Sequence, residues 1–92
     1  MDQSVVAPLE SAMLTGLQIR AGRALLKWST EHLADKARIG IASVHRAEAS
    51  DGMPNMQVRT LAAIKAALET GGVEFLDGYY TGSGGPGVRL KS

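Results

Sequence analysis

The alternation of apolar and polar positions predicts a first helix from about Gly16 to Lys27. Thr15 followed by Gln18 has the spacing of a capping box, in which the side chains of both residues cap the helix N-terminus. The basic residues of this segment share one side, and the apolar arc on the rest is wider than a surface helix needs. We therefore expect this helix to pack on two sides, against the rest of the domain and against a C-terminal strand or a second subunit.

Residues 28–48, WSTEHLADKARIGIASVHRAE, predict two short helices with a tight break between them. Ser29 is a favourable N-cap residue, and apolar residues then follow at helical spacing to about Ala37. Residues 38–40 interrupt the pattern, and a second helix runs from Ile41 to about Ala47. Two short helices joined by three or four residues are the layout of a helix-turn-helix, whose second helix enters the major groove of DNA. We expect Trp28, before the first of them, to fill the core.

A fourth helix and a hairpin complete the predicted order of elements. Residues 49–56 contain Asp51-Gly52 and Pro54 and predict a loop, which the helix Gln57–Thr70 follows. Two glycines then stop the helix. The strand-like segments Val73–Leu76 and Val88–Leu90 predict a terminal β-hairpin with a long loop.

The fold class expected from these elements is mostly α, a four-helix repressor-like helix-turn-helix domain with a C-terminal two-stranded β-hairpin. We divide the chain into three parts. Residues 1–14 are expected to be a flexible N-terminal extension, and residues 15–70 are the helix-turn-helix DNA-binding domain. Residues 71–92 are a hairpin tail packed on the same domain or on a dimer partner.

Composition narrows the range of functions. The chain of 92 residues has the length of one domain and contains no cysteine. Its two histidines, His32 and His45, are too few for a zinc site, which needs three or four ligands, so we expect no metal and no cofactor. No arrangement of nucleophile and base or of paired carboxylates stands out, and we expect no enzymatic activity. No apolar run approaches the roughly 20 residues of a membrane span, and a secretory signal pattern is missing, so we expect a cytoplasmic protein.

Charge supports nucleic-acid binding only through its distribution. The formal net charge is +1, yet residues 15–50 contain six basic and three acidic side chains. Phosphate binding depends on local rather than overall positive charge. On charge alone, an ordinary solvated surface remains an equally good interpretation.

The segment LQIRAGRALLKWSTEHLADKARIGIASVHRAE resembles the XRE or phage-repressor family of helix-turn-helix proteins. The family pattern has I-R-x-x-R in the first helix, then L-S-Q-x-x-L-A, a glycine turn and a recognition helix that closes in R-x-E. The matching residues here are Ile19-Arg20 with Arg23, Trp28-Ser29-Thr30, Leu33-Ala34 and Arg46-Ala47-Glu48. The tail resembles a bacterial subgroup of small repressor-like proteins that end in G-V-E-F and G-G-P-G-V-R-L. The resemblance covers nearly everything after Met13.

The resemblance implies a role for individual residues. The first residues of the recognition helix would contact base edges, and two further residues one helical turn later would also face the groove. A residue at the start of the preceding helix would contact the DNA backbone or a base. Two cations that precede the recognition helix would contact phosphates. These expected DNA-binding residues are Thr30, Lys36, Arg38, Ile41, Ala42, Ser43, His45 and Arg46. Arg46 would either read guanine or clamp a phosphate, and Arg23 would pair with Glu48.

The sequence departs from the family at the turn and at the reading positions. Arg38 stands where the family has the turn glycine, so it either adopts a left-handed conformation or requires a different turn. Gly40 replaces a Ser or Thr cap. Ile41 and Ala42 replace polar base readers, and apolar side chains contact thymine methyl groups but cannot make bidentate hydrogen bonds.

These observations predict a bacterial, sequence-specific DNA-binding transcriptional regulator of the repressor type that acts as a homodimer. A homodimer is expected because two-fold proteins of this kind read two half-sites about one DNA turn apart. The alternative is an antitoxin-like or protein-interaction module with a repressor fold and weak or no DNA binding. Ile41, Ala42 and the modest charge favour the alternative, whereas Lys36, Arg38 and Arg46 favour DNA.

Overall fold

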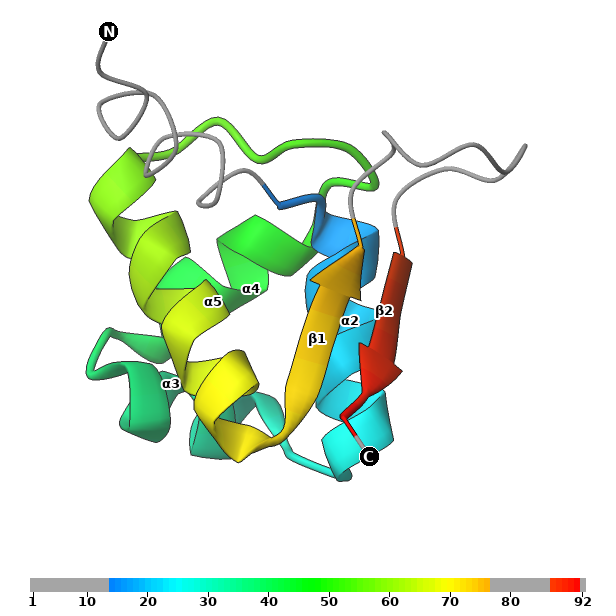
Figure 1. The fold of residues 1–92 in the computed structure, drawn as a ribbon. Coiled ribbons are helices and arrows are strands. Elements are labelled where there is room, and N and C mark those ends of the chain that lie inside the picture. The colour runs from blue at the N-terminus through cyan, green and yellow to red at the C-terminus, as the bar shows by residue number, and fades with distance from the viewer. Residues whose placement is uncertain (1–13, 77–86, 92) are drawn as a thin grey trace, which may run out of the picture.

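Four helices and a two-stranded sheet make up the part of the chain that the structure, a computed structural model, describes, residues 14–76 and 87–91 (Figure 1). The elements are α2 (Gly16–Leu26), α3 (Thr30–Ala37), α4 (Ile41–Glu48), α5 (Val58–Gly71), β1 (Val73–Leu76) and β2 (Gly87–Leu90). The predicted fold class, mostly helical with a C-terminal hairpin, is confirmed. The expected N-terminal extension up to residue 13 and the hairpin loop 77–86 lie outside the described residues.

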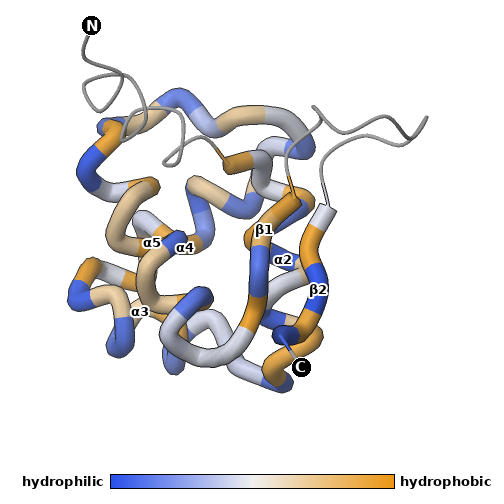
Figure 2. Tube along the Cα trace, viewed as in Figure 1, coloured by the Kyte–Doolittle hydropathy of each residue, from blue (hydrophilic) through white to orange (hydrophobic). Residues whose placement is uncertain are grey.

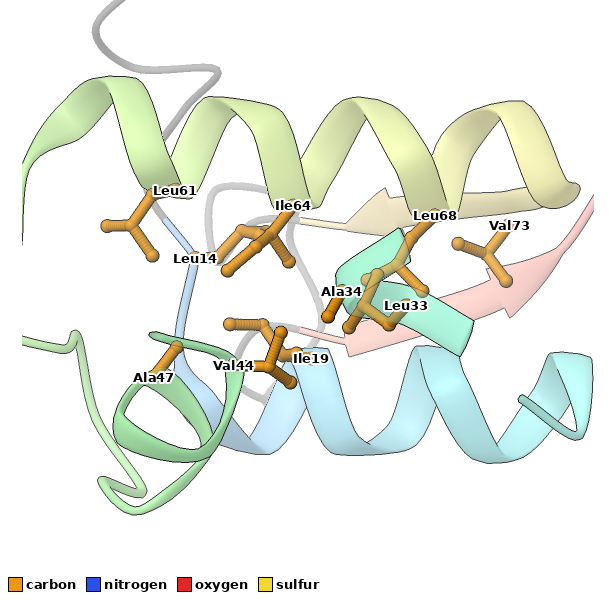
Figure 3. Close-up of a cluster of buried hydrophobic side chains, with 10 residues drawn as sticks. All are labelled: Leu14, Ile19, Leu33, Ala34, Val44, Ala47, Leu61, Ile64, Leu68 and Val73. Atoms are coloured by element: carbon orange, nitrogen blue, oxygen red, sulfur yellow. The ribbon is translucent and has the colours of Figure 1, made fainter. Parts of the chain in front are cut away.

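The core lies between α5 on one side and α2 and α4 on the other, and Leu33 and Ala34 of α3 reach into the space between them (Figure 3). Its largest fully buried side chains come from every helix, from β1 and from the residue before the N-cap of α2: Leu14, Ile19, Leu33, Ile64, Leu68, Val44 and Val73. Leu14 is only 1% exposed. The domain therefore begins one residue earlier than the sequence predicted, because Leu14 belongs to the core and not to the extension.

The predicted capping box is present at the start of α2. The Gln18 backbone N–H donates to Thr15 Oγ1 at 3.1 Å, and the Thr15 backbone N–H donates to Gln18 Oε1 at 3.0 Å. The Gln18 amide nitrogen also donates to the carbonyls of Leu76 at 3.2 Å and Gly87 at 3.0 Å. These two residues face each other across the hairpin. Gln18 thus ties the hairpin to α2 of the same chain.

The hairpin is antiparallel, with Val73 opposite Leu90 and Phe75 opposite Val88. Each strand carries one hydrophilic position between two hydrophobic ones (Figure 2), as expected for a sheet with one face on a core. Phe75 and Val88 pack against the core. On the other face, Arg89 Nε lies 3.2 Å from Glu74 Oε1.

One side of α2 stays uncovered. Leu17 is 52% and Leu25 is 39% exposed, and Ala21 between them is also exposed. These positions recur at intervals of four and lie on one side of the helix. Helices α4 and α5 and the hairpin pack against other sides of α2, so the wide apolar arc of this helix is only partly buried within the chain.

Candidate nucleic-acid interface

The turn between α3 and α4 keeps the geometry that a glycine would supply. Ser29 caps α3 as expected, its Oγ accepting from the His32 backbone N–H at 3.0 Å. At the other end Arg38 is left-handed, with φ 59° and ψ 46°, and its N–H donates to the carbonyls of Ala34 and Asp35. The Ile39 N–H donates to the Ala34 carbonyl at 3.1 Å. A left-handed non-glycine residue costs roughly 1–2 kcal/mol, which the surrounding contacts offset.

Helix α4 presents a continuous outward stripe. It begins after Gly40, which provides no side-chain cap, and it buries one side through Val44, Ala47 and Glu48. The four exposed residues of α4 occupy the first, second, fifth and sixth positions, which share one side of a helix. These residues are Ile41, Ala42, His45 and Arg46. Ser43 is half-buried at the edge of the stripe.

The C-terminal end of α4 is held from α2 by an ion pair. Arg23 Nε donates to Glu48 Oε2 at 2.8 Å and Arg23 Nη2 donates to Glu48 Oε1 at 3.0 Å, in a bidentate arrangement. Arg23 Nη1 also donates to the Trp28 carbonyl at 3.0 Å. The hydrogen bond with the Glu48 carboxylate raises the pKa of Arg23, while burial acts in the opposite direction. The pair therefore joins α2, α4 and the start of α3.

Arg20 makes a second connection that the sequence analysis missed. Its Nη1 donates to the backbone carbonyl of Glu48, and its Nη2 lies 2.8 Å from Asp51 Oδ1. The spacing of Arg20 and Arg23 in one turn, I-R-x-x-R, was the available signal. Residues three apart lie on the same side of a helix, so both arginines can reach the end of one partner helix.

The N-terminus of α2 meets the end of α4 by close backbone contact. A Cβ placed on Gly16 would lie 1.7 Å from the Ser50 carbonyl oxygen and 2.7 Å from that of Ala47. The Gly16 N–H donates to the Gly52 carbonyl at 2.9 Å. Only glycine permits this approach. Three contacts, at Gly16, Arg20 and Arg23, thus fix the orientation of α4 on α2.

The structure places the expected DNA-binding residues along α4, at the start of α3, and at a pocket between α3 and α5. Four of them form the α4 stripe, with Ser43 at its edge, and Thr30 is half-buried at the first residue of α3. Lys36 and Arg38 are exposed but line a pocket between α3 and α5. Trp28 lines the same pocket. It is half-buried and packs on the margin of the core, so the expectation that it fills the core is only partly right.

Ion pairing leaves a small positive excess in the helix-turn-helix region. Within residues 15–50, Arg23 is neutralised by Glu48, and Arg20 pairs with Asp51 outside that range. In the part of the chain that the structure describes, the remaining charges of this region form no ion pair. These unpaired residues are Lys27, Lys36, Arg38 and Arg46 on the basic side and Glu31 and Asp35 on the acidic side.

Comparisons of the chain with models of protein families, with curated proteins and with solved structures find no match. Within residues 14–76 and 87–91, no cluster of three or more His, Cys, Asp or Glu side chains is suited to hold a metal ion. None of the described helices has the length and apolar character needed to cross a membrane.

Proposed function

We propose that this chain is a sequence-specific DNA-binding regulator of transcription, of the XRE or phage-repressor type, in which α4 enters the major groove. The observation that carries the proposal is the outward stripe of α4, a helix whose C-terminal end is held on α2 by three contacts. A helix that reads bases must keep a fixed orientation, because small displacements break base-edge hydrogen bonds. Arg23 with Glu48, Arg20 and Gly16 supply that rigidity.

The side chains of the α4 stripe suit a recognition helix that makes few direct hydrogen bonds to bases. Arg46 is exposed and provides the guanidinium that pairs with guanine, and His45 adds a second polar group. Ile41 and Ala42, at the first turn, offer apolar contacts to thymine methyl groups. Lys36 and Arg38 are assigned to phosphates. A regulator of this kind works on chromosomal DNA, so we assign it to the bacterial cytoplasm.

We propose further that the regulator is a homodimer, because one α4 covers only a few base pairs. The uncovered side of α2, with Leu17, Ala21 and Leu25, is the surface proposed for the second copy. Leu17→Glu is expected to convert the dimer to a monomer in sedimentation equilibrium. Met53→Glu, which changes an equally exposed apolar residue in the loop after α4, is the control.

The test of DNA binding begins with selection of bound duplexes from random-sequence DNA. Fluorescence anisotropy then compares a selected duplex with a scrambled one at several salt concentrations. The proposal expects tighter binding to the selected duplex and an affinity that falls steeply with salt, because phosphate contacts release counterions. Arg46→Ala should cost about 1–3 kcal/mol and relax the preference at one base position, and Lys36→Ala should lower the salt slope by about one.

A second function, a protein-interaction module of the antitoxin type, is favoured by one observation. Ile41 is 37% exposed and lies beside the exposed Ala42, so the first turn of α4 is apolar where a base reader is usually polar. If the folded, dimeric protein binds neither duplex at low salt, the regulator proposal fails and this second function replaces it.

A further inference from the structure

An open pocket of about 390 Å³ lies between the C-terminal parts of α3 and α5. The two helices lie next to each other in Figure 1. Three alanines of α5, Ala63, Ala66 and Ala67, form one wall, and the Trp28 side chain forms another. The volume falls within the range of about 300–1,000 Å³ typical of small-molecule sites.

The Trp28 ring is fixed by its neighbours. A Cβ on Gly71 would lie 2.6 Å from the ring, so glycine at this position lets the indole pack directly against α5. The ring also contacts His32 in an edge-to-face arrangement with the ring centroids 4.7 Å apart. The indole therefore offers a preformed aromatic surface to the pocket.

The rim of the pocket carries two cations and no acid. Lys36 and Arg38 both line it, and no Asp or Glu does so among the described residues. Neither cation forms an ion pair in that part of the chain. Two like charges beside an apolar cavity favour an anionic group at the rim and an apolar group inside.

We propose that this pocket binds a small amphipathic carboxylate, a molecule with a compact apolar body and one carboxyl group. The apolar body packs between Trp28 and the alanines of α5, and the carboxylate accepts hydrogen bonds from Lys36 and Arg38. The site goes beyond DNA binding and stands whether or not the chain binds DNA. Arg38 is also the left-handed residue between α3 and α4, so the bound carboxylate contacts the turn of the helix-turn-helix.

Binding can be followed through Trp28, because it is the only tryptophan in the chain. The full chain is titrated with benzoate, with hexanoate, and with benzamide, which has the shape of benzoate without its charge. Sodium chloride keeps the ionic strength constant. The proposal expects a saturable change of Trp28 emission with benzoate or hexanoate, a higher melting temperature at saturation, and at least tenfold weaker binding of benzamide.

Substitutions locate the site. Lys36→Gln and Arg38→Asn, in which asparagine tolerates the left-handed conformation, should each weaken carboxylate binding about tenfold and leave the benzamide response unchanged. Ala66→Leu should fill the pocket and abolish binding. Ala62→Leu, on the exposed side of α5 and outside the pocket, is the matched control and should bind as the wild type does.

Four results would overturn the proposal. They are the lack of a saturable response to either carboxylate, equal binding of benzoate and benzamide, undiminished binding by the Ala66→Leu variant, and undiminished carboxylate binding by the Lys36→Gln variant. If Arg38→Asn does not fold, Lys36→Gln and Ala66→Leu still decide the question, because both change exposed side chains on helices.

Discussion

Glu48→Gln tests how strongly α4 is held to α2. The carboxylate is almost fully buried, with 9% side-chain exposure, and accepts two hydrogen bonds from Arg23, whose side chain is 23% exposed. Glutamine keeps the shape of the side chain but replaces one carboxylate oxygen with an NH2 group. This donor then faces an N–H donor of Arg23. Breaking a fully buried pair costs roughly 3–5 kcal/mol. Because water reaches part of Arg23, we expect a loss of about 2 kcal/mol in the free energy of unfolding and of about 10 °C in melting temperature.

Glu31→Gln is the matched control, since it removes the same charge from an exposed position in the first turn of α3. Both variants are followed by thermal and urea unfolding with circular dichroism. A double-mutant cycle with Arg23→Gln isolates the pair from the other hydrogen bond of Arg23, to the Trp28 carbonyl, and should give a coupling of about 1.5 kcal/mol. Equal small shifts for Glu48→Gln and Glu31→Gln, or a coupling near zero, would refute the reasoning.

Three further substitutions test the contacts that position the elements. Gly16→Ala should destabilise the fold by about 3 kcal/mol in urea unfolding, because its Cβ would overlap the Ser50 carbonyl. Gly22→Ala in the same helix meets only ordinary contacts and should stabilise the fold by about 0.5–1 kcal/mol. The reverse order of stabilities would contradict the packing of α2 on α4. Gln18→Ala should lower the free energy of unfolding by about 2 kcal/mol and speed amide hydrogen exchange in β1 and β2. Gln57→Ala is the control, because the Gln57 side chain makes no cap hydrogen bond. Unchanged exchange in the Gln18→Ala variant would show that Gln18 does not hold the hairpin. Arg38→Gly should stabilise by about 0.5 kcal/mol by relieving the left-handed residue, and Arg38→Ala should not; equal melting temperatures would show that the turn is unstrained.

The sequence was sufficient for the helices and their caps, because these depend on local patterns. Thr15 with Gln18 and Ser29 each cap the helix that follows them in the chain, and the hydrogen bonds span three residues. The pairing of Arg23 with Glu48 was predicted from the family pattern, because two residues 25 positions apart share no local sequence signal.

Long-range contacts to backbone carbonyls escaped prediction. Arg20 donates to a backbone carbonyl, and every residue offers one, so no residue type marks the partner. The second role of Gln18, across 58 residues to the hairpin, was hidden for the same reason. Leu14 did have a signal, because the residue before an N-cap often packs on the fourth helical residue, here Ile19, and both are buried.

The pocket could not be predicted from the sequence, because one of its walls consists of alanines, which carry no distinctive sequence signal. Alanines at helical spacing in α5 are equally consistent with a tightly packed face. Whether they leave a cavity depends on where α3 and Trp28 lie, which only the packed structure determines. The sequence likewise did not indicate that Lys36 and Arg38, expected to contact phosphates, also line this pocket.

The most direct test of the central proposal places a negative charge on the stripe of α4. Ala42 is exposed at the second residue of α4, where a glutamate is compatible with the helix dipole and should not disturb folding. Ala62 is an exposed alanine near the start of α5 and serves as the matched control. In anisotropy titrations with a selected duplex at fixed salt, Ala42→Glu should weaken binding at least a hundredfold while Ala62→Glu remains close to the wild type. Equal affinities of the two variants, both folded, would contradict the assignment of α4 as the helix that enters the major groove.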